Sequence, residues 1–385
     1  MTLSVRIAAT AMVVEKTLEL GPAAAWIPLA APVTIRGGVI SISDSLNAKT
    51  TYYRLQSLTP ADSAIAAPEG IWTWAPFTNA FCMEGTTTGF GINRSTQSSR
   101  VLIYMAAGGA CWNEQTCQIL NTAVHGPFGD AQFAQLTPAL SAAWLFDRTR
   151  ATNPFRDYSF VYVPYCTGDL HAGSRVTTEG NQVARHVGYR NMTAFLERLV
   201  PTFPAASRVI LLGSSVGGMG ATFNWAQTQR AFGGIRVDLI DDSGPILAAE
   251  SVALGKGLLS AEPRAAWDVD SVMASACPEC QGAPDALVSV HAAAFLQSRA
   301  ALLTRTQDAV LANFYGITPG QFETGLKAVL KARFDPLPNV HYFMASGSGH
   351  MFLGAEPTAV SNGTTLLSFL ERMLQDDAAW GSVAP

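Results

Sequence analysis

Short apolar runs alternate with helical patterns from about residue 100 onward. This alternation is typical of a mostly parallel sheet with helices on both faces. All but one of the runs end at glycine, cysteine or acidic residues, and open α/β sheets place their ligands at the carboxyl ends of the strands. The predicted strands are Val101 to Ala106, Phe160 to Pro164, Val209 to Leu212, Val237 to Ile240, Arg299 to Thr304 and Val340 to Ala345.

Helical periodicity predicts the elements that connect these strands. Four apolar residues between positions 192 and 199 recur at i, i+3, i+4 and i+7, which indicates a core-facing helix that ends near Pro201. Two further helices are expected, over Val216 to Phe232 and Thr364 to Leu374. Residues 245 to 292 are less periodic and separate two strands by more than a minimal crossover, so we expect them to form a cap or lid.

The first 95 residues have a different pattern. Apolar and polar residues alternate over Val39 to Ile42, and an aromatic, turn-rich segment covers Trp72 to Pro76. We expect antiparallel strands here, at an edge of the sheet. The chain is therefore divided into an N-terminal extension, residues 1 to 50, and one α/β domain, residues 51 to 385, that carries the cap.

Composition supports one large core. Of the 385 residues, 48% are hydrophobic and only 14% are charged, which is enough apolar surface for a stable domain of this length. The net charge of −4 and the scattered Lys and Arg residues argue against nucleic acid as a partner. No run reaches the roughly 18 to 20 consecutive apolar residues that a membrane span needs. We therefore expect a soluble protein without a membrane span. No feature of the sequence specifies an oligomeric state, and a monomer is expected.

Six cysteines, an even number, predict an oxidising compartment, so we expect a secreted or periplasmic protein. The alternative is buried free thiols in a cytosolic enzyme. Cys277 and Cys280 could form half of a zinc site, but no second pair of ligands follows, so a disulfide is favoured and no metal is expected. The cysteines are Cys82, Cys111, Cys117, Cys166, Cys277 and Cys280.

The N-terminus makes a poor signal peptide. The apolar run Ile7 to Val14 is followed by Glu15 and Lys16, where small residues would mark a cleavage site. Either a natural leader is missing from this sequence or export is not used. The predicted location therefore depends on the cysteines.

The strongest chemical signal is a GxSxG motif between an apolar strand and a helical pattern. The strand Val209 to Leu212 runs into Gly213-Ser214-Ser215-Val216-Gly217. In a nucleophile elbow the serine occupies a sharp strand-to-helix turn, and the flanking glycines avoid steric clashes. The frame selects Ser215, not Ser214, as the nucleophile.

An oxyanion needs backbone amides close to that serine. The amide of Val216 opens the following helix, where unpaired N–H groups and the helix dipole favour negative charge. The second donor is expected in a glycine-rich turn after an earlier strand, which gives Gly109 and Ala110 as candidates. An ordinary tight turn would explain the Gly-Gly pair equally well.

The base and its acidic partner are sought among later residues, because the chain order in hydrolases of this type is Ser, acid, His. Of six histidines, His350 follows the last strand in a loop of small residues that would let the imidazole reach Ser215. Asp308 follows a strand between the two and is the predicted acid. Asp335 is the runner-up, and Asp241 and Asp242 come too soon after the nucleophile.

Six short motifs occur in order within a stretch from about Tyr53 to His350: Phe81-Cys82-Met83-Glu84-Gly85, Gly108-Gly109-Ala110-Cys111-Trp112-Asn113, Tyr165-Cys166-Thr167-Gly168, Ser214-Ser215-Val216-Gly217-Gly218, Asp242-Ser243-Gly244 and Gln307-Asp308. In this order they resemble the pectin acetylesterase and Notum family of carboxylesterases. The resemblance implies an α/β-hydrolase fold, a Ser-Asp-His triad and no metal or other cofactor. It also implies disulfides between Cys82 and Cys166 and between Cys111 and Cys117.

Departures from the family pattern bear on the substrate more than on the reaction. Ala107 and Ala110 replace a glycine and a tryptophan of the family, and Val216 replaces an alanine. The resemblance implies a serine esterase that removes acetyl or other short acyl groups from a polysaccharide such as pectin.

Three alternatives remain open. Because Trp112, Phe128 and Trp144 would line an apolar acyl pocket as readily as they would stack on sugars, an esterase for lipid or polyester acyl groups is the first, although aromatic residues are more often core. The second is acyl transfer to an acceptor other than water. The third is a non-catalytic binding protein on a hydrolase scaffold.

Overall fold

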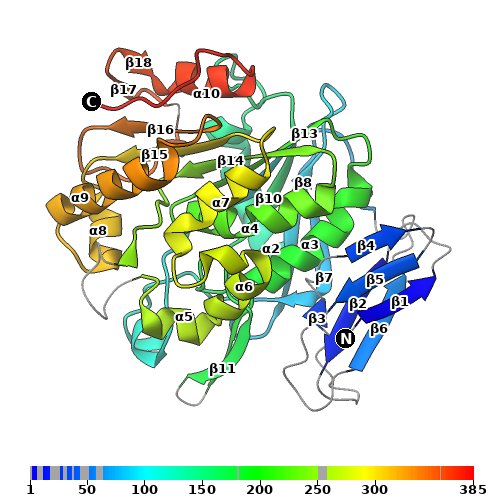
Figure 1. Ribbon diagram of the computed structural model, residues 1–385. Coiled ribbons are helices and arrows are strands. Elements are labelled where there is room, and N and C mark those ends of the chain that lie inside the picture. The colour runs from blue at the N-terminus through cyan, green and yellow to red at the C-terminus, as the bar shows by residue number, and fades with distance from the viewer. Residues whose placement is uncertain are drawn as a thin grey trace. The chain divides into compact units, whose positions relative to one another are not determined.

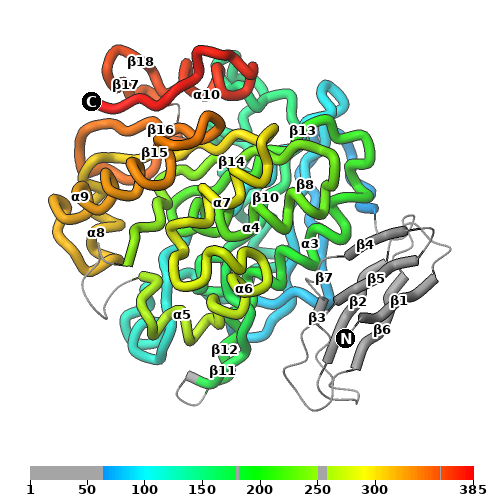
Figure 2. Tube along the Cα trace, viewed as in Figure 1, coloured from blue at the N-terminus to red at the C-terminus, as the bar shows by residue number. Residues whose placement is uncertain are grey.

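The computed structural model describes residues 64–179, 182–249, 258–355 and 357–385 (Figure 2), together with six strands between Thr2 and Ser57. The chain divides into two compact units, residues 1–64 with 197–202 and residues 65–196 with 203–385. The first unit holds two three-stranded antiparallel sheets, and the alternating segment at Val39 falls in one of them. These sheets contain β1 (Thr2–Arg6), β5 (Val39–Ser43) and β4 (Val33–Arg36), and β3 (Ile27–Pro28), β2 (Met12–Thr17) and β6 (Tyr52–Ser57).

The second unit is built on an eight-stranded sheet with the order β16-β15-β14-β13-β9-β10-β8-β7 (Figure 1). The six strands from β16 to β10 are parallel, and β8 and β7 extend the sheet antiparallel at one edge. All six predicted parallel strands are present, with ends that differ by at most two residues. The strands are β7 (Thr73–Phe81), β8 (Thr87–Asn93), β9 (Arg100–Met105), β10 (Ser159–Val163), β13 (Arg208–Ser214), β14 (Arg236–Asp242), β15 (Ala300–Arg305) and β16 (Val340–Ala345).

The strand order reverses at β9. The chain passes from β9 to β10 on one side and then returns to β13 on the other side of β9. In open α/β sheets such a reversal opens a crevice at the carboxyl ends of the strands, because the connections leave in opposite directions. Two of the predicted site segments follow β9 and β13 directly, so the topology brings them to one corner.

Helices cover both faces of the sheet, and two adjacent residues of β8 show which helix lies on which face. Side chains alternate along a strand, so Phe90 and position 91 face opposite sides. The Phe90 ring lies 5.4 Å from the ring of Phe195 in α3 (Gly188–Thr202). On the other side, Gly91 leaves room for the ring of Phe133 in α2 (Asp130–Ala142), which a Cβ would overlap. Thus α2 and α3 cover opposite faces.

The remaining helices also lie on the two faces of the sheet. Helix α4 (Val216–Phe232) packs on β13 and β14, beside α3 and α7 (Leu287–Ala294) (Figure 1). On β16, Tyr342 contacts Phe334 of η6, whereas the next residue, Phe343, contacts Phe369 of α10 (Leu366–Leu374). The last helix was predicted from Thr364 but begins at Leu366, because Thr364 and Thr365 form a short strand. The other elements are η1 (Gln115–Ile119), η2 (Trp144–Phe146), β11 (Arg175–Glu179), β12 (Gln182–His186), α5 (Ala261–Trp267), α6 (Val269–Ala276), η4 (Pro278–Cys280), η5 (Pro284–Ala286), α8 (Ala309–Tyr315), α9 (Pro319–Val329), η6 (Leu330–Phe334), β17 (Val360–Ser361) and β18 (Thr364–Thr365).

The segment predicted as a cap lies between β14 and β15. In its described part it contains helices and no strand. Its helix α5 reaches the loop that follows β9, since Trp267 Nε1 donates to the Cys111 carbonyl at 2.9 Å and Asn113 Nδ2 donates to Glu262 at 2.6 Å. The segment therefore touches one wall of the predicted site, and its role as a lid stays a prediction.

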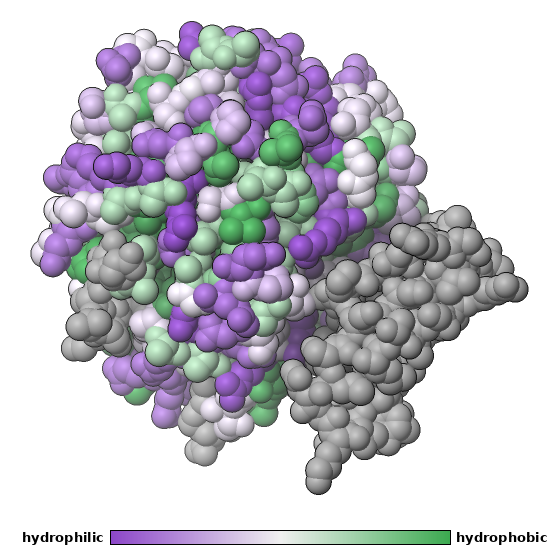
Figure 3. Space-filling model, viewed as in Figure 1, coloured by the Kyte–Doolittle hydropathy of each residue, from purple (hydrophilic) through white to green (hydrophobic). Residues whose placement is uncertain are grey.

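Within the described residues, no helix combines the length and the apolar character needed to cross a bilayer. Hydrophilic and hydrophobic residues are interspersed on the face of the second unit drawn in Figure 3. Such mixing is ordinary for a protein surface, much of which is apolar.

The amino ends of β13 and β14 are tied to α10 by a buried ion pair. Arg208 Nε donates to Asp238 at 2.5 Å, and Arg208 Nη1 donates to the Leu374 carbonyl at the end of α10 at 2.6 Å. Asp238 is fully buried and also accepts from Arg236 at 2.7 Å. Asp376 contacts the same arginines, but its side chain is 49% exposed. Loss of Asp238 would leave Arg208 buried without its carboxylate.

We therefore predict that Asp238→Ala lowers the free energy of unfolding by about 3 to 5 kcal/mol, the cost of breaking a buried ion pair. Urea denaturation measures this. Asp376→Ala is the matched control, and its exposed pairs should contribute less than about 1 kcal/mol. Equal losses of unfolding free energy in the two variants would contradict the assignment of the buried Arg208–Asp238 pair as the stabilising contact.

Candidate active site

Ser215 occupies the turn between β13 and α4 in a strained backbone conformation. Its φ of 57° and ψ of −126° are unusual for a residue with a side chain. Both motif glycines are required here, because a Cβ on Gly213 would overlap the Gly217 carbonyl and a Cβ on Gly217 would overlap the Met105 carbonyl. The sequence thus folds locally into the predicted elbow, with Ser215 7% exposed.

Asp308 and His350 form a hydrogen-bonded pair. His350 Nδ1 lies 2.6 Å from Asp308 Oδ2. Asp308 is fully buried and caps α8, since its other oxygen, Oδ1, accepts from the amides of Val310 and Leu311 at 3.0 Å each. One oxygen is therefore fixed by the helix and the other is left for the imidazole.

His350 lies in the loop after β16, and backbone hydrogen bonds tie this loop to the end of β14. The amide of Met351 donates to Ser243 Oγ at 3.1 Å, and the amide of Phe352 donates to Asp242 Oδ1 at 2.9 Å. The amide of Ser215 donates to the Asp242 carbonyl at 2.7 Å. The structure thus brings the Ser215 turn and the His350 loop to the same residue, Asp242.

The free nitrogen of the imidazole faces away from Asp308. His350 Nε2 is buried and has no hydrogen-bond partner among the described residues, and the whole side chain is 12% exposed. Such a nitrogen can accept a proton once a hydroxyl reaches it. In uncomplexed enzymes this last hydrogen bond is often long, and it tightens when substrate binds.

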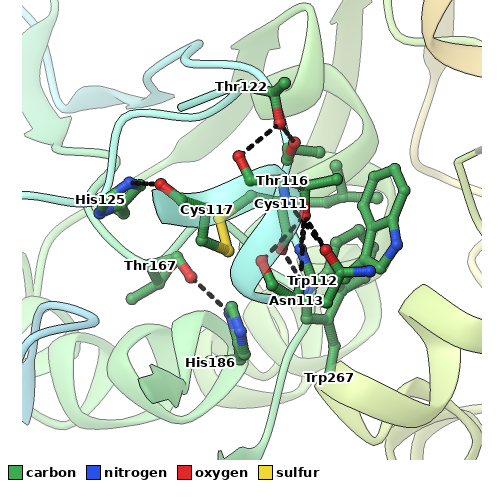
Figure 4. The surroundings of a disulfide bond; sticks show 12 residues. Cys111, Trp112, Asn113, Thr116, Cys117, Thr122, His125, Thr167, His186 and Trp267 are labelled. Carbon is green, nitrogen blue, oxygen red and sulfur yellow. Dashed lines mark hydrogen bonds between the residues drawn. A yellow bond between two sulfur atoms is a disulfide. The ribbon is translucent and has the colours of Figure 1, made fainter. Parts of the chain in front are cut away.

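The loop after β9 is braced by a disulfide and by threonine side chains (Figure 4). Cys111 is bonded to Cys117, and Thr122 Oγ1 donates to the Ala110 carbonyl at 2.6 Å. The Val124 amide donates to the Gly108 carbonyl at 2.6 Å, beside an isolated antiparallel bridge between Gly109 and Ala123. The candidate oxyanion turn is therefore held rigidly before any ligand binds.

All six cysteines are paired, and within the described residues none is free. The bonds are Cys82–Cys166, Cys111–Cys117 and Cys277–Cys280. The first two match the pairing that the family resemblance implied. Because Cys277 and Cys280 are bonded to each other, they have no thiolates for zinc, and the described part of the chain holds no cluster of His, Cys, Asp or Glu that could bind a metal ion.

The runner-up acid and two of the other histidines have different surroundings. Asp335 precedes β16, at the end of the sheet opposite to His350, and is exposed. His171 is buried and Nε2 lies 3.0 Å from the Ala106 carbonyl, and burial lowers its pKa. His186 contacts the Thr167 carbonyl at 2.8 Å. His171 and His186 therefore each have a backbone carbonyl as partner, and Asp335 is at the opposite end of the sheet.

The aromatic residues expected near the site divide into core and partly exposed positions. Trp144 is 4% exposed and belongs to the core. Trp112 is partly exposed and lies 6.2 Å from Trp267, ring centre to ring centre. Phe128 lies 6.3 Å from Tyr162. Only Trp112 and Phe128 keep the exposure that a ligand contact requires.

Asp242 contacts both sides of the site, since its carbonyl accepts from the Ser215 amide and its carboxylate accepts from the Phe352 amide. The sequence reasoning set Asp242 aside together with Asp241, because both follow the nucleophile helix too closely to be the triad acid. A usable signal was present, since β14 pairs with β13 and its carboxyl end must lie beside the elbow.

A mostly parallel sheet of this strand order, with a GxSxG serine between a central strand and its helix, defines the α/β-hydrolase class. Residues 71–277 match the family model described as pectinacetylesterase. The match covers more than half of the chain, and the protein belongs to the pectinacetylesterase family.

Individual relatives are more distant. The palmitoleoyl-protein carboxylesterase NOTUM of Schmidtea mediterranea is 29% identical over 157 residues, which are 40% of this chain and 29% of that protein. Palmitoleoyl-protein carboxylesterase notum2 of Xenopus laevis is 27% identical over 145 residues, 37% and 29% of the two chains. The chain thus matches less than a third of the length of these curated relatives. The solved structure of the Wnt deacylase Notum from Drosophila superposes with a TM-score of 0.61 at 16% identity, over 82% of this chain and 96% of that chain, which shows the shared fold.

The strain at Ser215 is measurable without any substrate. We predict that the free energy of unfolding of Ser215→Gly is about 1 kcal/mol higher than that of Ser215→Ala, because glycine adopts a positive φ without steric cost. Urea titrations of the two variants give the difference. An alanine variant as stable as the glycine variant would contradict the strained turn.

Proposed function

We propose that this protein is a serine carboxylic-ester hydrolase that acts through an acyl-enzyme. Ser215 is the nucleophile, His350 is the general base and Asp308 orients the histidine. The observation that carries the proposal is the combination of a strained strand-to-helix serine with a buried Asp–His pair anchored to the same strand end. Membership of the pectinacetylesterase family supports the same chemistry.

The reaction follows from these roles in two half-reactions. His350 Nε2 accepts the Ser215 hydroxyl proton as Oγ attacks the ester carbonyl, and the same proton passes to the leaving alcohol as the ester C–O bond breaks. Water then attacks the carbonyl carbon of the acyl-enzyme and gives one proton to His350. The bond between that carbon and Ser215 Oγ breaks, and Oγ takes the proton back from His350. Carboxylic acid, alcohol and free enzyme result.

The oxyanion of each tetrahedral intermediate needs donors that are already in place. The Val216 amide opens α4 and is one donor in this proposal. Between Gly109 and Ala110, Gly109 is favoured. Gly109 and Ala123 face each other in an antiparallel bridge, and the Val124 amide donates to the Gly108 carbonyl. In this pattern the amides on either side of the facing pair point across the bridge, so the Ala110 amide points toward Thr122 and the Gly109 amide points away from the bridge.

Asp308 acts through geometry and charge. Its contact with Nδ1 keeps the neutral imidazole in the tautomer that leaves Nε2 unprotonated, and its carboxylate stabilises the imidazolium that forms on proton transfer. Because two amides of α8 hold the carboxylate, it cannot turn away when the histidine moves.

Acetyl or other short acyl groups on a polysaccharide are the proposed substrates, which the family model supports. A second candidate, hydrolysis of longer apolar acyl groups, is favoured by a specific feature of the β9 loop. Ile119, Leu120 and Val124 in the loop after β9 are 66%, 59% and 52% exposed, and the Val124 amide donates to the Gly108 carbonyl of the oxyanion turn. Exposed apolar residues at a site mouth can contact an acyl chain. Two curated relatives are named as palmitoleoyl-protein carboxylesterases.

Three disulfides support a location in an oxidising compartment, and we propose a secreted or periplasmic protein. Acyl transfer to an acceptor other than water would use the same residues and would appear as a new ester when alcohols are added.

The decisive experiment compares wild type with Ser215→Ala on p-nitrophenyl acetate and p-nitrophenyl palmitate, with mass spectrometry after fluorophosphonate treatment. We predict that hydrolysis and labelling both disappear in the variant, that the label is on Ser215, and that acetate is the better substrate. A preference for palmitate would favour the second candidate. Unchanged hydrolysis in the variant would overturn the proposal, and a wild type that neither hydrolyses nor labels would favour a non-catalytic binding protein.

For the acid, we predict that Asp308→Asn lowers turnover by about four orders of magnitude, as in measured triads, because the amide favours the wrong tautomer. Circular dichroism should show a folded protein. Asp335→Asn is the matched control and should retain wild-type turnover, since its carboxyl group is exposed at the other end of the sheet. The reverse result would move the assignment to Asp335.

A further inference from the structure

A second carboxylate, that of Asp242, lies at the end of β14 and is fully buried. Its two oxygens accept four hydrogen bonds from uncharged donors. Oδ1 accepts from the Phe352 amide at 2.9 Å and from Ser243 Oγ at 3.3 Å. Oδ2 accepts from the Leu353 amide at 3.0 Å and from Ser214 Oγ at 3.1 Å.

Three of these donors come from the two segments that must meet for catalysis. Ser214 directly precedes the elbow serine, and the Asp242 carbonyl also accepts from the Ser215 amide at 2.7 Å. Phe352 and Leu353 follow His350 by two and three residues. Ser243 Oγ accepts from the amide of Met351, the residue between His350 and Phe352. A single side chain therefore links segments that are more than 130 residues apart in sequence.

The cost of this arrangement argues for a specific role. Burial raises the pKa of Asp242 above its usual value, and hydrogen bonds from Leu353, Phe352 and Ser214 offset only part of this rise. In the described part of the chain no Lys or Arg forms an ion pair with Asp242, unlike Asp238 and Asp285, which pair with arginines. A buried carboxylate held only by neutral donors is expensive, and two backbone amides specify its position.

We propose that Asp242 is a positioning residue that sets the separation between Ser215 and His350. The inference rests on the serine-hydrolase function proposed above and assigns a role to a residue outside the triad. Asp242 does not touch the reacting atoms. It holds the backbone after His350 against the strand end that carries Ser215, so that Nε2 is presented to the hydroxyl.

The test uses Asp242→Asn. In this variant an NH2 group replaces one of the two carboxylate oxygens, and it cannot accept the hydrogen bond of the backbone N–H that it faces. We expect kcat for p-nitrophenyl acetate to fall about 100-fold, as for a misplacement of about 1 Å, with KM nearly unchanged. The rate of fluorophosphonate labelling at Ser215 should fall in parallel, because labelling needs the same proton transfer.

Asp285→Asn is the matched control for loss of a buried carboxylate. Asp285 is 6% exposed and pairs at 2.9 Å with Arg333 of η6, which belongs to neither the Ser215 turn nor the His350 loop. We expect this variant to lose stability while its kcat per folded molecule stays at the wild-type value. A kcat loss of the same size in both variants would reduce Asp242 to a structural residue and overturn the inference.

Two milder variants cover the case in which Asp242→Asn does not fold. Ser214→Ala removes one donor to Asp242, and Ser243→Ala removes the acceptor for Met351. Each should lower kcat several-fold without changing KM. If wild type hydrolyses the ester in a Ser215-dependent way and both serine variants keep wild-type kcat, the positioning role is refuted while the proposed function stands. If wild type has no such activity, both proposals fail.

Discussion

The strained turn at Ser215 is the constraint on which the site depends. A non-glycine residue with φ of 57° and ψ of −126° costs about 1 to 3 kcal/mol and persists only where its surroundings enforce it. Here the enforcement is close packing: the turn can form only because Gly213 and Gly217 lack side chains, and the Ser215 amide is bonded to the neighbouring strand end. The parallel register of β9, β13 and β14 therefore determines where the hydroxyl lies.

Features that depend on local pattern could be predicted from the sequence. The six parallel strands are short apolar runs, and the elbow is a strand, a GxSxG motif and a helix in direct succession. Asp308 was selected because it follows a strand, and the structure places it within hydrogen-bond distance of the predicted His350. Chain order and strand ends were sufficient here, because parallel strands bring their carboxyl ends to one edge.

Features that depend on contacts distant in sequence could not be predicted in this way. The hydrogen bonds from Phe352 and Leu353 to Asp242 span 110 and 111 residues, so the position of Asp242 at a strand end does not reveal which loop its carboxylate holds. The tie between Arg208 and the end of α10 spans 166 residues. Trp144 was expected to line a pocket but is buried in the core. Residue type alone does not show whether an aromatic ring faces a pocket or the core.

Two buried carboxylates restrict His350 from different directions. Asp308 holds the ring at Nδ1, and Asp242 holds the backbone two and three residues further along. Their anchors are independent, since one carboxylate caps α8 and the other ends β14. With the ring and the backbone both fixed, little freedom remains except small rotations that move Nε2 relative to the elbow. Because Nε2 has no partner among the described residues, in the proposed mechanism its hydrogen bond to the Ser215 hydroxyl forms when substrate binds and excludes water.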